Sequence, residues 1–138
     1  MQTHQAGKTN VTMIIVDSAE TVFPAVPESV GAARRFTRAA LRRHDIDPTI
    51  IDTATLLVSE LATNAIVHAT STIRLRVGVG DDIRVEVRDA SDDAPVVGDA
   101  DEDHESGRGL AIVTTLADSW DWTPRASGKV VWFELARA

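Results

Sequence analysis

Glu60 and Asn64 stand four residues apart in an otherwise apolar segment, and this spacing of polar groups could do chemistry. Residues at i and i+4 lie on the same face of a helix, so Glu60, Asn64 and His68 would form one polar ridge. A carboxylate can take a proton from a nucleophile, and an Asn oxygen is a neutral Mg²⁺ ligand that adds no negative charge beside a phosphate. The pattern indicates a catalytic, metal-binding helix face, although the same spacing also occurs on ordinary solvated helix faces.

A second acid, Asp89, ends a segment in which apolar and charged residues alternate with the period of a β-strand. Ile83, Val85 and Val87 share one face, and Asp89 continues their parity, so its carboxylate is expected on the core side. A carboxylate in that position needs hydrogen-bond donors, because an unpaired buried charge is costly or becomes protonated. The amino group of a ligand is one candidate donor. The alternative is a turn in which Asp89 bonds the backbone amides that follow it.

A glycine motif, Gly107-Arg108-Gly109-Leu110, leads into an amphipathic run that ends near Ala117. Glycines allow the backbone to approach a ligand closely, and the free N–H groups in the first turn of a helix can hold a phosphate. Arg108 would add a cation. The motif therefore predicts a glycine loop that feeds a phosphate-binding helix, although two glycines alone can also make an ordinary loop.

The order of these parts along the chain resembles the GHKL superfamily of Bergerat-fold ATPases and kinases, which includes gyrase, histidine kinases and MutL. More narrowly, the chain resembles the small actinobacterial anti-sigma factor serine/threonine kinases of the RsbW and SpoIIAB type. The segments that carry this resemblance are residues 59–65, 87–91, 107–110 and 128–133. The resemblance extends from about Met13 to the end of the chain, and the three motifs together are more specific than any one of them.

The resemblance implies a role for each motif residue. Asn64 would coordinate the Mg²⁺ that bridges the ATP phosphates, Glu60 would be the general base, and Asp89 would bond the adenine amino group. His68 fits the N-x-x-x-H pattern of the family, although a histidine near a helix end can also serve the terminal carbonyls. The remaining cofactor-binding residues would be Gly107, Arg108, Gly109 and Leu110, with Arg108 reaching the terminal phosphate.

Two departures from the family pattern predict weakened nucleotide affinity. Relatives with strong ATPase activity carry Asp-x-Gly-x-Gly where this chain has Asp89-Ala90-Ser91-Asp92-Asp93. In addition, this chain has Val130 near the position where many relatives have a Thr that helps to hold adenine. Neither change removes the acid, the Asn or the phosphate-side glycines.

The resemblance therefore implies an ATP- and Mg²⁺-dependent anti-sigma factor. It would sequester a sigma factor and phosphorylate a Ser or Thr of an anti-anti-sigma antagonist of the STAS type, and the resemblance also implies a homodimer. The alternative is a catalytically inactive or weakly nucleotide-binding module of the same fold that acts by partner binding alone.

The elements that must position these residues predict an α+β two-layer sandwich, with helices on one face of a mixed, mostly antiparallel sheet. Strands are expected at 11–16, 72–79, 83–89, 119–123 and 129–136, and helices at 28–44, 48–69 and 109–117. Trp120, Trp122 and Trp132 are expected to pair across strands on the less buried face. Residues 1–10 are predicted to be a disordered tail, and residues 11–138 a single domain.

Composition restricts the class of protein. The 138 residues carry a formal net charge of -7 and no cysteine, which disfavours direct nucleic-acid binding and excludes disulfides and thiolate metal sites. We expect no membrane-length apolar span and no signal peptide, and therefore a cytoplasmic protein. The basic face of helix 28–44 could dock an acidic partner or a second subunit, or could simply be solvated; it consists of Arg34, Arg35, Arg38, Arg42 and Arg43.

Overall fold

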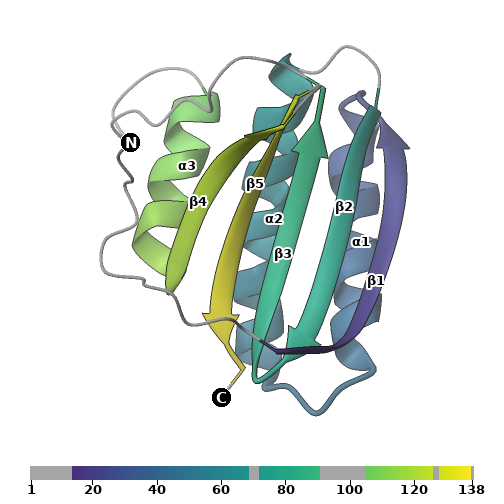
Figure 1. Ribbon diagram of the computed structural model, residues 1–138, viewed down its shortest axis with the longest axis vertical. Helices are drawn as coiled ribbons and strands as arrows, with labels where there is room; N and C mark the ends of the chain where they lie inside the picture. Colours follow the sequence, from purple (N-terminus) through teal and green to yellow (C-terminus); the bar gives the residue numbers. More distant parts are fainter. Residues whose placement is uncertain (1–13, 69–71, 91–104, 126–127, 138) are drawn as a thin grey trace.

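The computed structural model describes residues 14–68, 72–90, 105–125 and 128–137. Five strands form one sheet in the order β1-β2-β3-β5-β4, and three helices cover one of its faces (Figure 1). The strands are β1 (Ile15–Pro24), β2 (Thr72–Gly80), β3 (Asp82–Asp89), β4 (Ser119–Arg125) and β5 (Gly128–Ala136). The helices are α1 (Glu28–Arg42), α2 (Pro48–His68) and α3 (Glu105–Leu116). The predicted two-layer α+β sandwich is thus confirmed.

The sheet differs in one respect from the prediction of a mixed sheet. All four strand pairings in the described residues are antiparallel. A parallel pair needs a long crossover between its strands, whereas β2 and β3 are joined by a tight turn at Asp81, and β4 and β5 are also consecutive neighbours in the sheet.

The core lies between the sheet and the helices, with α2 at its centre. This helix packs against both α1 and α3, and also against β2, β3 and β5. Its start is well defined, because the carboxylate of Asp47 accepts a hydrogen bond from the Thr49 N–H (2.8 Å) and Pro48 occupies the first helical position. The largest fully buried apolar side chains of the core include Leu57, Leu61, Ile83 and Phe133.

The apolar character of α2 corrects one sequence expectation. By length and composition alone, residues Pro48–Val67 could cross a membrane, although no span of that kind was expected. In the structure 56% of this span is buried inside the protein, beneath the sheet and between the other two helices. It is therefore the core helix of the domain.

The bounds of the first strand and of the last helix differ most from the predictions. The first strand occupies Ile15–Pro24 rather than 11–16, and residues 11–13 lie outside the described part of the chain. Its alternation is obscured because apolar residues such as Val16 and Val22 occupy the solvent-facing positions of this edge strand. Helix α3 begins at Glu105, four residues before the predicted start, so the glycine motif lies in its first turns instead of in a preceding loop.

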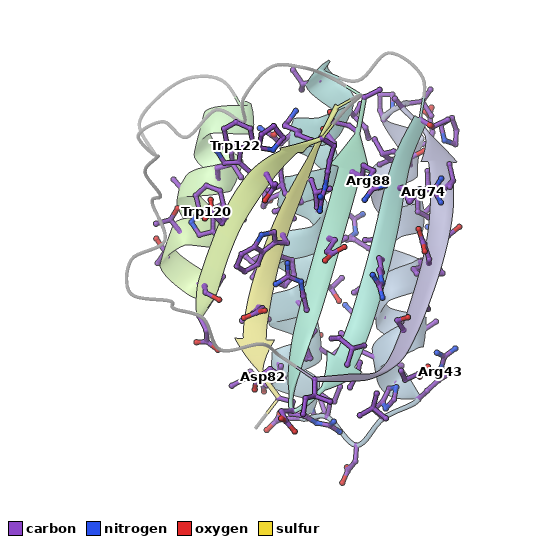
Figure 2. All side chains as sticks on the ribbon, viewed as in Figure 1. Arg43, Arg74, Asp82, Arg88, Trp120 and Trp122 are labelled. Atoms are coloured by element: carbon purple, nitrogen blue, oxygen red, sulfur yellow. The ribbon has the colours of Figure 1, made fainter. Side chains whose placement is uncertain are left out.

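The tryptophans of β4 point to the opposite side from the one predicted. Trp120 pairs in register with Phe133, and Trp122 with Val131, so both face the helices, on the α3 side of the sheet (Figure 2). Only Trp132 is on the open face, where the guanidinium of Arg84 stacks 4.1 Å from its ring centre. Parity within one strand does not fix the face of a neighbouring strand, because the register between the two strands decides it.

Candidate functional site

The predicted functional segments meet at one end of the sandwich. The carboxyl ends of α2 and β3 and the first residues of α3 and β5 all lie at the top of the molecule in Figure 1. Strand pairing fixes part of this arrangement, since Asp89 at the end of β3 lies opposite Ile73 of β2 and Lys129 of β5. Residues far apart in the sequence are thereby brought to one site.

On α2, the side chains of Glu60 and Asn64 differ in their surroundings. Asn64 is 2% exposed, and among the described residues its Nδ2 atom has no hydrogen-bond partner. A buried amide group without a partner is costly, so it is typical of a site that a ligand completes. Glu60 is partly exposed and already interacts within the protein. The helix therefore carries a buried amide at Asn64 and, one turn earlier, a more accessible carboxylate at Glu60.

Asp89 faces the helix layer, as its strand parity predicted, and it is 3% exposed. The sequence indicates a ligand amino group as one candidate donor and a turn as the alternative, and the structure shows a further, internal donor. The ammonium of Lys129 lies 3.2 Å from Oδ1 and 3.1 Å from Oδ2 of Asp89, and Lys129 is itself only 1% exposed. The sequence held a signal for this pair, because Lys129 shares the parity of Val131, Phe133 and Leu135 and therefore had to be a buried cation.

Gly128 allows β5 to begin close to Asp89. Its φ of +144° lies in a region that L side chains rarely adopt, and a Cβ atom there would stand 1.9 Å from the backbone oxygen of Asp89. Any other residue at this position would push β5 away from the end of β3. Gly128 thus positions the neighbouring Lys129 against the carboxylate.

The phosphate-side candidates are described only in part. The side chains of His68, Gly107, Arg108 and Gly109 lie outside the described residues, so their predicted contacts stay predictions. Leu110 is fully buried in the hydrophobic core, where it anchors α3. Among the described residues no three His, Asp or Glu side chains group into a metal site. A Mg²⁺ ion held through Asn64 would therefore take most of its remaining oxygen ligands from phosphates and water.

Comparison with known proteins identifies the family. A family model described as the histidine kinase-like ATPase domain matches residues 23–135, which is most of the chain. The chain belongs to this family. This assignment confirms the GHKL resemblance found in the sequence.

The fold of this histidine kinase-like ATPase domain is also similar to a solved structure, the crystal structure of the RsbU and RsbW domains of Rv1364c from Mycobacterium tuberculosis. The TM-score is 0.64 at 18% sequence identity, and the match covers 88% of this chain and 32% of that one. The histidine kinase-like ATPase domain described here thus spans about a third of that longer protein. The comparison with curated proteins found no match.

Within the histidine kinase-like ATPase fold, the structure also shows which β5 residue can affect the site. Val130 was singled out in the sequence, but it pairs with Arg88 and so lies on the face opposite Asp89. The β5 residue with a direct contact to the site is Lys129, whose side chain contacts the Asp89 carboxylate.

Proposed function

We propose that this domain binds ATP together with Mg²⁺ and acts as an anti-sigma factor kinase. The observation that carries the proposal is the Asn64 side chain, which is buried in the core helix one turn from Glu60 and whose Nδ2 donor has no hydrogen-bond partner among the described residues. Asn64 lies on α2, whose carboxyl end is at the same end of the sandwich as the carboxyl end of β3 and the first residues of α3. Membership of the histidine kinase-like ATPase family supports ATP as the ligand.

In the proposed reaction each residue has a separate task. Glu60 accepts the proton of a Ser or Thr hydroxyl, and its partial exposure leaves it accessible to a protein substrate. Asn64 holds the metal without adding negative charge beside the phosphates, and Arg108 offsets charge on the transferred phosphoryl group. Mg²⁺, when bound, neutralises part of the phosphate charge. Asp89 binds the adenine amino group.

The proposed partners are a sigma factor, which the domain would sequester, and an anti-anti-sigma antagonist of the STAS type, which it would phosphorylate. The sequence resemblance to RsbW-type kinases supports both partners, a cytoplasmic location and a homodimer. The exposed basic residues of α1, among them Arg34 and Arg35, provide a surface for an acidic partner in a protein whose net charge is -7.

A second candidate function is a module of the same fold that binds partners without catalysis. The ion pair between Asp89 and Lys129 favours it, because the carboxylate expected to bind adenine already has an internal donor. The segment after Asp89 also lacks the glycines of active relatives. Under this alternative, nucleotide affinity would be weak, and control would come from partner binding alone.

Calorimetric titration with ATP, with and without Mg²⁺, followed by phosphotransfer from radiolabelled ATP to candidate antagonists, tests both functions. The kinase proposal requires Mg²⁺-dependent ATP binding and label on a Ser or Thr of one antagonist. Binding of sigma factor without phosphotransfer to any antagonist would favour the non-catalytic module.

A further inference from the structure

The ion pair between Lys129 and Asp89 has an unusual setting. The two residues lie directly opposite each other in β5 and β3, and both side chains face the helix layer. The three preceding pairs on this face are apolar: Val87 with Val131, Val85 with Phe133 and Ile83 with Leu135. Among these β3–β5 pairs, a charged pair thus replaces an apolar one only at the end of the two strands that lies at the candidate site.

Stability alone is a weak reason for this couple. Removing two charges from water costs about as much as their attraction returns, and well-packed apolar residues often do as well or better in such positions. The neighbouring pairs show that this ladder accommodates apolar residues. The chemistry of the pair therefore calls for a functional explanation.

The couple places a hydrogen-bond donor and an acceptor side by side. The ammonium nitrogen of Lys129 is 3.1–3.2 Å from the carboxylate oxygens of Asp89, so both could address neighbouring atoms on one edge of a planar ligand. Adenine has such an edge, where the N6 amino group is a donor and the adjacent ring nitrogen N1 is an acceptor. Guanine reverses the order, with the O6 acceptor beside the N1–H donor.

We propose that Lys129 is a second base-specificity residue of the nucleotide site: its ammonium donates to adenine N1 while Asp89 accepts from the N6 amino group. This inference rests on the ATP binding proposed above. Guanine in the same position would place its carbonyl against the carboxylate and its N1–H against the ammonium, so both contacts would be repulsive. Lys129 therefore strengthens the preference for adenine that Asp89 alone would give.

Burial of the couple supports this role in two ways. Asp89 and Lys129 are sealed from solvent, so water does not compete with the base for either group once the surrounding side chains have shifted to admit it. The two charges also compensate each other, so a neutral base binds without leaving a net charge buried.

The test compares ATP with 1-deaza-ATP, an analogue that keeps the N6 amino group but carries C–H in place of N1. In calorimetry with Mg²⁺, the parent protein should bind the analogue roughly 10- to 100-fold more weakly, because a charge-assisted hydrogen bond is lost. Lys129→Met should bind the two nucleotides with equal affinity. The control is Arg88→Met, which changes the residue before Asp89; this residue lies on the open face (Figure 2). The control should keep the parent's ratio of affinities for ATP and 1-deaza-ATP.

The outcomes separate this inference from the function on which it rests. Equal affinity of the parent for ATP and 1-deaza-ATP would overturn the role of Lys129 and leave ATP binding intact, whereas no ATP binding by the parent would overturn both. The parent comparison needs no variant, so it decides the question even if Lys129→Met fails to fold. Lys129→Gln retains an N–H donor, so it should keep part of the preference for ATP over 1-deaza-ATP. The proposal would be contradicted if a folded Lys129→Gln variant bound both nucleotides equally while Lys129→Met kept the affinity ratio of the parent.

Discussion

At the scale of single residues, burial divides the polar ridge of α2 into two kinds of group. Asn64 is sealed in the protein, whereas Glu60 on the preceding turn is partly exposed. A metal ligand benefits from a dry, fixed position, and a base for a protein substrate must be reachable. The two residues should therefore respond differently to substitution.

Replacing Asn64 by Ala should remove the Mg²⁺-dependent part of ATP affinity while the fold persists. The amide has no partner at Nδ2 among the described residues, so its loss breaks few internal interactions. Calorimetry with and without Mg²⁺ measures the affinity, and circular dichroism checks the fold. Binding of Mg²⁺ and ATP equal to that of the parent would show that Asn64 is not the metal ligand.

Glu60→Gln keeps the shape of the side chain but removes the base. ATP binding should survive, and phosphotransfer to the antagonist should fall by roughly 10²–10⁴-fold, the usual contribution of a general base. The pH profile of the rate provides the control, because the residual activity should no longer follow the ionisation of a carboxylate. An unchanged rate would assign the base to another group.

At the scale of elements, the site depends on where strands and helices end. Strand β5 starts at Gly128, and only a glycine can make that approach to Asp89. A second junction lies at the opposite end of the sheet, where the two residues after α1 contact β1: Asp17 accepts from His44 (2.9 Å) and from Arg43 (3.3 Å). Each junction supports a separate prediction.

Gly128→Ala should destabilise the protein and weaken ATP binding together. The new Cβ atom would overlap the Asp89 carbonyl, and the φ of +144° is strained for alanine, so we expect a loss of about 2 kcal/mol or more in the free energy of unfolding. Chemical denaturation measures this change. The matched control is Gly31→Ala in α1, where the nearest atoms are the ends of flexible arginines, and the helix should gain about 0.5–1 kcal/mol. Equal effects of the two substitutions would contradict this explanation.

Asp17 should make the fold sensitive to acid. The hydrogen bond from His44, with a further contribution from Arg43, holds the pKa of Asp17 below its usual value of 3.8. A carboxylate with a lowered pKa stabilises the folded state above that value, and the contribution disappears as the pH falls through the folded-state pKa. At about pH 5 the parent should therefore melt at a higher temperature than Asp17→Asn, and the difference should shrink below pH 3.8. Arg43→Gln should keep most of this dependence, whereas a pH-independent difference would exclude Asp17 as its source.

At the scale of the whole molecule, the two faces of the sheet have different roles. One face carries the core and the candidate site, and no helix of the described residues covers the other, which carries charged side chains (Figure 2). On the open face Arg84 pairs with Glu86 (2.9 Å) and Glu134 (2.7 Å), and it also stacks on Trp132. These partly exposed charged groups and the tryptophan ring therefore stabilise one another on this face.

Because the proposed ligand would bind where α2, α3, β3 and β5 meet, ATP should stabilise the whole domain. With Mg²⁺ and ATP at about 100 times the dissociation constant, the free energy of unfolding should rise by about 2.7 kcal/mol, since the ligand binds only the folded state. Thermal unfolding followed by calorimetry measures the shift. Asn64→Ala should lose the Mg²⁺-dependent part of it. A parent melting temperature that stays constant under these conditions would contradict ATP binding at this site.

Local periodicity was sufficient to predict the faces of the main elements. The i, i+4 spacing predicted the ridge on α2, and period-two alternation predicted that Asp89 faces the core. The prediction for Asp89 succeeded because a side chain's direction within one strand follows from backbone geometry alone. The ridge stays a prediction, since the side chain of His68 lies outside the described residues. The order of the motifs added the family, which the comparison with known proteins confirmed.

The partner of Asp89 and the faces of Trp120 and Trp122 were decided only in the tertiary structure. Both depend on which residue of β5 stands opposite a given residue of β3 or β4, and a shift of one residue would reverse every face. That register is set by the packing of the sheet against the helices and by the close approach at Gly128. Local patterns place Asp89 and Lys129 each on the core side of its own strand, but the two residues are 40 positions apart, so those patterns do not show that they meet.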